Sequence, residues 1–170
     1  MRYAVLAALG WVLLSSAAFA ETKGEAEFQN GQGEKIGTAT LTEGADGVKI
    51  AIVVSKLSPG PHGLHIHAAG KCEGPDFKSA GGHLNPEGKK HGLKSPEGPH
   101  AGDLPNLMVG SDGSAKTEVT TKQVTFKEGK NSLLQPEGTA LVIHVAEDDE
   151  KTDPIGNAGP RAACGVIKKK

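Results

Sequence analysis

Aromatic side chains are scarce in this chain of 170 residues, where Phe, Tyr and Trp together make up 4%. The single Tyr and the single Trp lie among the first twenty residues, and the remainder keeps Phe28, Phe77 and Phe126. A core built from that remainder therefore depends on Val, Ile, Leu and Ala. No excess of charge of one sign exists either, since the formal net charge is −1 at pH 7. This balance argues against nucleic acid or a membrane surface as a partner.

Long apolar runs are also rare, and the clearest one extends from Ala4 to Leu14. A basic start precedes it and the small-x-small sequence Ala18-Phe19-Ala20 follows it, as in a secretory signal peptide. We expect a signal peptide over residues 1–20, cleaved after Ala20, and one domain over 21–170. The run is short for a membrane span, so an uncleaved anchor is the weaker interpretation. The cleavage point lacks a cysteine, so nothing suggests a lipid anchor. The protein is thus expected to be secreted, and periplasmic if its source is a Gram-negative bacterium.

Cysteine is scarce too, because the chain has only Cys72 and Cys164. An exported protein passes through an oxidising compartment, where an even pair of cysteines forms a disulfide. The loop closed by this disulfide would span most of the domain and contribute about 4–5 kcal/mol in the chain-entropy model. Two free buried thiols, or thiolate ligands of a metal, are the alternatives.

No segment has the periodicity of an amphipathic helix, and short β-prone runs separated by Gly, Pro, Asn and Asp fill the chain instead. The strongest run, 47–57, has apolar residues at alternate positions, as a strand with one buried face does. A hairpin is expected over 107–120 with its turn at Ser111-Asp112-Gly113. The other expected strands are 24–29, 37–42, 63–67, 124–126, 139–145 and 164–167. About eight short strands indicate an all-β sandwich or barrel.

Two long polar segments, 68–105 and 147–163, do not fit this strand pattern. Long loops without secondary structure in a compact domain are either disordered or functional. The first segment holds Cys72 and four potential metal ligands, which favours a functional role.

Histidines are concentrated in one part of the chain. His65 and His67 are two apart on an expected strand, so both side chains leave the same face and could bind one metal. Taken alone, this pair could equally be a half-exposed strand face. His62 is interpreted as structural, and His144, remote in the sequence, would by itself be interpreted as a core or edge histidine.

Three further histidines, His83, His91 and His100, lie in the first long segment, and Asp103 follows them. Three imidazoles and a carboxylate are a plausible tetrahedral zinc set. The alternative, that they are polar surface residues, weakens because six of the seven histidines fall between residues 62 and 100.

Several motifs together resemble one known family. They are Gly63–His67, Gly82–Pro86, Lys90–Gly92, His100–Leu107 and Gly156–Ile167. Their order and spacing are similar to those of the copper–zinc superoxide dismutases, over essentially the whole chain after residue 20. The long loop from Cys72 to His83 is similar to that of the exported bacterial members. The resemblance implies an eight-stranded Greek-key β-barrel or sandwich with two long functional loops.

The resemblance also implies two metals, one copper and one zinc per subunit, and an enzyme that converts superoxide to dioxygen and hydrogen peroxide. The implied copper ligands are His65, His67, His83 and His144, and the implied zinc ligands are His83, His91, His100 and Asp103. His83 would bridge the two metals and deliver a proton to substrate. No organic cofactor is implied.

Two further roles follow from the resemblance. Asp148 would link His65 to His91, and Arg161 would supply positive charge beside the copper. Pro160 departs from the family pattern and restricts Gly159, so the position of Arg161 is less firmly implied than the ligands are. A non-catalytic copper-binding or copper-buffering protein on the same fold is the alternative function. The sequence leaves open whether the protein is a monomer or a homodimer.

Overall fold

The computed structural model describes residues 21–170, so the expected signal peptide lies outside the described residues. A three-stranded antiparallel meander opens the fold, formed by β1 (Thr22–Asn30), β2 (Lys35–Gly44) and β3 (Gly47–Val54). Later in the chain, β6 (Leu107–Val109) and β7 (Ala115–Thr121) are joined through the expected turn at 111–113, but they lie in different sheets and do not pair, so the expected hairpin over 107–120 is not formed. β7 pairs with β3 in antiparallel register.

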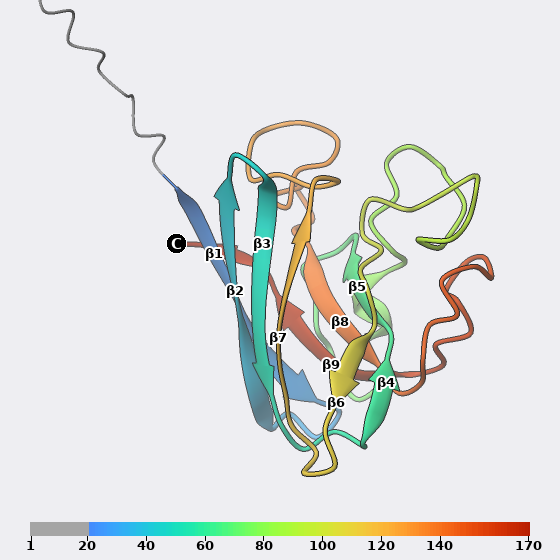
Figure 1. Cartoon of the computed structure of the whole chain (residues 1–170). Coiled ribbons are helices and arrows are strands. Elements are labelled where there is room, and N and C mark those ends of the chain that lie inside the picture. Colours follow the sequence, from blue (N-terminus) through green and yellow to red (C-terminus); the bar gives the residue numbers. More distant parts are fainter. Residues whose placement is uncertain (1–20) are drawn as a thin grey trace, which may run out of the picture.

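The other strands come from distant parts of the chain. They are β4 (Gly60–His62), β5 (Leu64–His67), β8 (Ala140–His144), β9 (Arg161–Val166) and β10 (Lys168–Lys169). The main eight-stranded sheet has the order β5-β8-β9-β1-β2-β3-β7, with β10 also paired to β1, and β4 pairs with β6 in a second small sheet. β9 returns to lie beside the first strand of the meander, which is the Greek-key connection. The sheet curls round on itself (Figure 1). This arrangement confirms the expected all-β barrel or sandwich.

The interior of the barrel is built by strand alternation. All four apolar residues at alternate positions of β3 are buried, whereas Val53 between them is 53% exposed. Phe28 and Phe126 belong to the same large core. Alternation on β8 sends Leu141 and Ile143 into that core and Ala140 and Val142 to the opposite face.

A second, smaller cluster lies on this opposite face, under the loop that follows β5. It contains Phe77 and Ala80, the latter on the short 3₁₀ helix Lys78–Ala80, packed against Cys72 and Cys164. The two cysteines form the expected disulfide. The third phenylalanine and the disulfide therefore fasten the loop to the outer face of the sheet.

Two further expectations about strands were wrong. Residues 124–126 form no strand: Thr125 makes only an isolated bridge to Ser132, and the carboxylate of Glu43 accepts the Phe126 N–H at 2.8 Å and the Thr125 hydroxyl proton. Arg161 lies at the start of β9 and not in a loop, since β9 pairs with β8 as far as His144. The two expected long segments are bounded by strands as 68–106, called the first loop below, and 145–160, called the second loop, and a third long connection, 122–139, joins β7 to β8.

In the described part of the chain, no helix has the length and hydropathy that crossing a membrane requires.

Candidate metal centre

The first loop brings expected ligands to the sheet because part of it lies along the free edge of β5. Ile66 donates its N–H to the Gly102 carbonyl and accepts the Leu84 N–H, both at 2.8 Å. His83 and Asp103, next to these residues in sequence, are thereby placed against β5. A Cβ at Gly102 would lie 2.2 Å from the Ile66 carbonyl oxygen, so only glycine permits this close approach.

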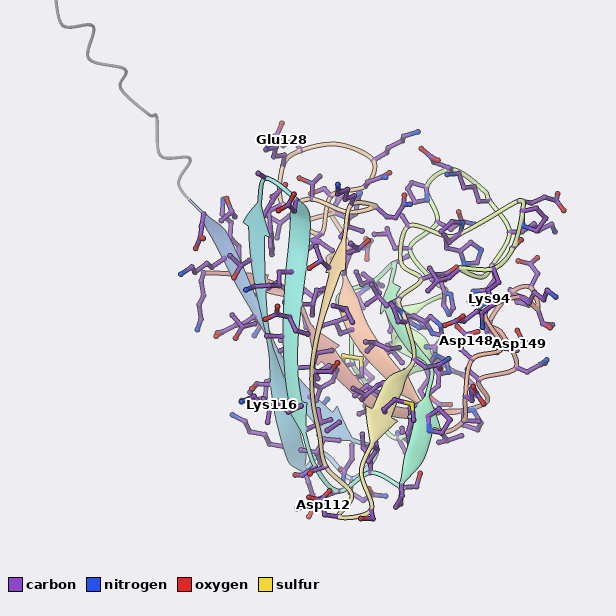
Figure 2. All side chains as sticks on the ribbon, in the orientation of Figure 1. Lys94, Asp112, Lys116, Glu128, Asp148 and Asp149 are labelled. Atoms are coloured by element: carbon purple, nitrogen blue, oxygen red, sulfur yellow. A yellow bond between two sulfur atoms is a disulfide. The ribbon has the colours of Figure 1, made fainter. Side chains whose placement is uncertain are left out.

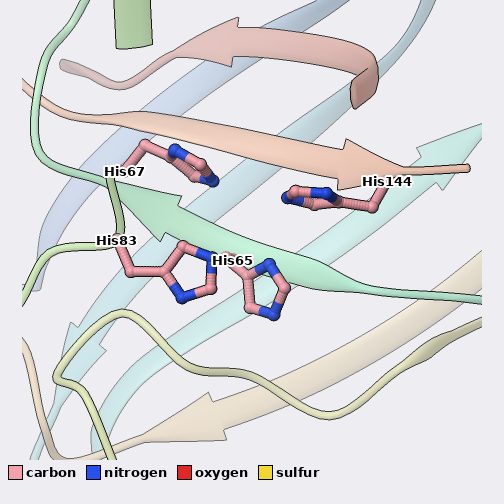
Figure 3. Close-up of side chains that lie close together, drawn as sticks. All are labelled: His65, His67, His83 and His144. Atoms are coloured by element: carbon pink, nitrogen blue, oxygen red, sulfur yellow. The ribbon is translucent and has the colours of Figure 1, made fainter. Parts of the chain in front are cut away.

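Four imidazoles meet on the outer face of β5 and β8, as Figure 3 shows, and we call them the four-histidine group: His65, His67, His83 and His144. Leu64 and Ile66 alternate with two of them and point into the core, so the face is set by the strand period. One nitrogen from each ring lies within 4.8 Å of the others. The rings are buried, and the strands that hold them are paired, so the group is rigidly positioned.

The proton positions on three of these rings follow from their hydrogen-bond partners. Nδ1 of His67 donates to the Gly81 carbonyl and Nδ1 of His144 donates to the Gly159 carbonyl, each at 2.9 Å. Nε2 of His65 donates to the carboxylate of Asp148 at 2.6 Å. Because carbonyl and carboxylate oxygens only accept, the opposite nitrogen of each neutral ring carries a lone pair.

Those lone-pair nitrogens are buried and have no hydrogen-bond partner: Nδ1 of His65 and Nε2 of His67 and His144, with Nε2 of His83 as a fourth. Buried polar atoms are normally satisfied, so four unpartnered nitrogens in one place need an explanation. An all-imidazole set of lone pairs suits a copper ion.

A second group surrounds the other side of His83, and we call it the histidine–aspartate group: His83, His91, His100 and Asp103. Oδ1 of Asp103 lies 2.9 Å, 3.1 Å and 3.3 Å from the Nδ1 atoms of His83, His91 and His100. Nδ1 of His100 also lies 3.3 Å from Nδ1 of His83. Ligand atoms about 2.0–2.1 Å from a tetrahedral zinc ion are about 3.3 Å apart, so these separations fit zinc.

By proximity alone, His65 also comes within 4.8 Å of His83, His91 and Asp103. We assign His100 and not His65 to the histidine–aspartate group, for two reasons. Nε2 of His65 is engaged by Asp148, and its Nδ1 is one of the four unpartnered nitrogens.

Burial and nearby charges shift the pKa values of individual histidines in the two groups in different directions. Burial lowers the pKa of His65 to about 3 and that of His144 to about 4, so both rings are neutral and able to bind a metal at pH 7. For His91, burial acts in the same direction, but hydrogen bonds to Asp103 and Asp148 outweigh it and raise the pKa to about 9. Asp103 keeps a pKa well below its usual range, because contacts with His83 and His91 outweigh its burial.

Asp148 joins the two groups. Its Oδ2 accepts from Nε2 of His65 at 2.6 Å and its Oδ1 lies 3.0 Å from Nε2 of His91. The side-chain amide of Asn106 holds the backbone of Asp148 through two hydrogen bonds of 2.8 Å, one to its carbonyl and one from its N–H. Asp148 therefore contacts one histidine of each group.

Comparison with known proteins agrees with this geometry. A family model described as copper/zinc superoxide dismutase matches residues 35–167. The copper–zinc superoxide dismutase 1 of Aquifex aeolicus is 52% identical, across 95% of this chain and 96% of that protein. The Escherichia coli copper–zinc superoxide dismutase is 39% identical, across 99% of this chain and all of that protein. The chain belongs to the copper/zinc superoxide dismutase family.

A solved structure supports the same fold. The crystal structure of a double mutant of a superoxide-dismutase-like protein from Bacillus subtilis superposes with a TM-score of 0.82 at 42% identity. The superposition covers 84% of this chain and 95% of the Bacillus subtilis chain. Family membership gives the activity: the protein is an oxidoreductase that converts superoxide to dioxygen and hydrogen peroxide, with copper and zinc as its metals.

Arg161 lies beside the four-histidine group. Its guanidinium is half-buried and donates to the carbonyl oxygens of Phe77 and Gly81 in the first loop. Gly81 uses the same carbonyl to orient His67. The charge of Arg161 contributes to lowering the pKa of His67 and His144, after the larger effect of burial. Arg161 therefore places a positive charge next to these histidines.

Two other residues complete the comparison with the sequence. His62 stays outside both groups and is buried, with its two nitrogens 2.6 Å and 2.8 Å from the carbonyl oxygens of His144 and Ser58. The structural interpretation of His62 therefore agrees with its contacts. Sequence reasoning gave no role to Asn106, although it lies within the motif that carries His100 and Asp103.

Proposed function

We propose that the four-histidine group holds the copper of this superoxide dismutase and that the histidine–aspartate group holds the zinc, with His83 shared. The observation that carries the proposal is the position of the two nitrogens of His83. Nδ1 lies among the atoms of the histidine–aspartate group, and Nε2 is one of the four unpartnered nitrogens. A single imidazole whose nitrogens face two different ligand groups supports a bridging role.

When bound, copper supplies a one-electron couple that superoxide can both reduce and reoxidise, while zinc supplies fixed positive charge without redox chemistry. The chain's own task is to place anion and proton. His83 can carry a proton on Nε2, the nitrogen that faces the four-histidine group, and can donate it to a reduced dioxygen species. Asp103 holds the other nitrogen at 2.9 Å, so the ring keeps its orientation while Nε2 gains or loses the proton.

Arg161 supports capture of the substrate. Its guanidinium is held by two carbonyls and so keeps its orientation without losing its charge. Positive potential in a cleft raises the association rate of an anion by roughly 10 to 10³, and salt screens this effect. We assign Arg161 to binding and orientation of superoxide beside the copper ligands.

We further propose that residues 1–20 are a cleaved signal peptide and that the protein works outside the cytoplasm, in the periplasm if the source is Gram-negative. The disulfide between Cys72 and Cys164 supports this location, because disulfides persist in oxidising compartments. Expression of the full chain in a Gram-negative host and N-terminal sequencing of the periplasmic protein test this proposal. A periplasmic protein that begins at Glu21 is expected, and an intact Met1 would contradict it.

The ligand assignment is tested on the same purified protein by metal analysis. We expect one copper and one zinc per chain, and superoxide decay far faster than with copper on an unrelated protein. A His144→Ala variant should lose copper but keep zinc, and a His100→Ala variant should lose zinc preferentially. Each variant should keep the β-sheet circular dichroism of the parent. If His144→Ala kept both copper and activity, the assignment would be wrong.

His62 offers a matched control, since it is a buried histidine outside both groups. A His62→Gln variant should lose stability but retain both metals. If the metal-loaded parent protein removes superoxide no faster than copper bound to the unrelated protein does, the copper-buffering alternative would be favoured instead.

A further inference from the structure

The second loop is hydrogen-bonded to the first loop through Asp153, a residue that belongs to neither ligand group. Oδ1 of Asp153 accepts the backbone N–H of His91 at 2.8 Å, and Oδ2 pairs with Nζ of Lys90 at 3.1 Å. The same Oδ1 lies 3.9 Å from Nε2 of His100. One carboxylate therefore faces three neighbouring groups of the first loop.

The rings of the histidine–aspartate group show why that position matters. Each ring directs Nδ1 toward Asp103, so Nε2 is the nitrogen left for a partner outside the group. In His83 this nitrogen faces the four-histidine group, and in His91 it contacts Asp148. In His100 it points toward Asp153. The distance of 3.9 Å is too long for a direct hydrogen bond, and it suits a bridging water or a charge–dipole contact.

Asp148 and Asp153 act on His91 from different sides. Asp148 is buried and contacts the ring, whereas the side chain of Asp153 is 40% exposed and binds the backbone of the same residue. A second contact joins the loops nearby, since Lys94 pairs with Glu150 at 2.8 Å and donates its N–H to the Glu150 carbonyl. Figure 2 shows Lys94 beside Asp148 and Asp149 at this junction.

We propose that Asp153 is a positioning residue that fixes His91 and His100 and slows the loss of zinc from the histidine–aspartate group. This inference rests on the proposed zinc ligands. Residues that orient metal ligands through hydrogen bonds typically change metal affinity 10- to 100-fold when replaced. Asp153 has the contacts of such a residue on the solvent side of the zinc ligands, and Asp148 has them on the copper side.

The test measures zinc release from the copper- and zinc-loaded protein into a chromophoric chelator. An Asp153→Ala variant should release zinc roughly 10- to 100-fold faster than the parent. An Asp153→Asn variant keeps an oxygen that can accept the His91 N–H but loses the charge, so its rate should lie between the two. Copper content and the circular dichroism spectrum should be unchanged in both variants.

Glu118→Gln supplies the control, because it breaks a surface ion pair with Lys49 on β3 and β7, away from both loops. Its zinc release should match the parent. Unchanged zinc release in Asp153→Ala, or equal loss of copper and zinc, would overturn the positioning role while leaving the ligand assignment intact. A parent protein that binds no zinc would overturn both. If Asp153→Ala does not fold, the Asp153→Asn rate decides alone, and a parental rate contradicts the proposal.

Discussion

Adding a single methyl group at Gly156 should displace Asp148 and disturb the histidine–aspartate group. Gly156 has a φ of +61°, and a Cβ there would lie 1.7 Å from Oδ1 of Asp148 and 2.8 Å from Nε2 of His91. Heavy atoms in ordinary contact are about 3.5 Å apart, so the Asp148 oxygen would have to move by about 2 Å. Gly156→Ala cannot relieve this overlap without breaking the hydrogen bond between Asp148 and His91.

The cost of this change has two parts. An alanine in the left-handed region costs about 1–2 kcal/mol. Loss of a hydrogen bond to a charged group adds about 1.5–3 kcal/mol. Gly156→Ala should therefore lower the free energy of unfolding by about 3–5 kcal/mol and weaken zinc binding about 10- to 100-fold, because a ligand loses the partner that orients it.

Gly33 provides the matched control. It lies between β1 and β2 with a φ of +78°, and a Cβ there would have no heavy atom within 4 Å. Gly33→Ala should cost only the conformational part, about 1–2 kcal/mol, and leave zinc binding unchanged. Urea unfolding and competition with a zinc chelator measure the two quantities. Equal zinc affinity in the two alanine variants would refute the reasoning, since it would mean that the loop yields without moving Asp148.

Three further predictions concern stability and substrate capture. Replacing Cys72 and Cys164, which are 92 residues apart, by alanine should lower the free energy of unfolding by about 4–5 kcal/mol in urea titrations. In the metal-free protein, His144, with its pKa lowered to about 4, should make stability fall as pH decreases from about 6.5 to 4, because the unfolded chain then binds more protons. His91, raised to about 9, should make stability fall as pH increases from 6.5 to 9, so calorimetry should find a maximum near neutral pH with slopes of about 1.4 kcal/mol per pH unit for each group. Arg161→Gln should slow superoxide decay roughly tenfold and flatten its dependence on ionic strength in stopped-flow measurements, and an unchanged salt dependence would contradict its role.

The strands were predictable where side-chain alternation is local. On β3 every second residue is apolar and buried, and that pattern needs no knowledge of the neighbouring strands. The segment 124–126 has the same β-prone composition, but the N–H of its Phe126 is accepted by the carboxylate of Glu43, more than eighty residues away. A composition that favours a strand does not reveal which group will accept its N–H, so this segment could not be distinguished from a real strand.

The two histidine-containing groups were predictable for a different reason. Imidazole is an uncommon side chain, and its concentration between residues 62 and 100 carries information even before pairing is known. The residues that orient these histidines carry less information in the sequence. Asp153 contacts His91 across 62 positions and Asn106 contacts Asp148 across 42 positions, and each is an ordinary surface residue type. Their roles arise from how the two loops pack together.

Backbone acceptors are the least visible part of the site, since every residue has a carbonyl. The carbonyls that orient His67 and His144 nevertheless belong to Gly81 and Gly159, and both glycines have a φ of +73°. A left-handed residue turns its carbonyl in a direction that right-handed or extended backbone does not reach, and glycine does so without strain. A Cβ at Gly81 would have no heavy atom within 4 Å, so space does not explain that glycine. The direction of the carbonyl does. The two glycines thus mark in the sequence the hydrogen bonds that leave Nε2 of His67 and of His144 free of a hydrogen-bond partner.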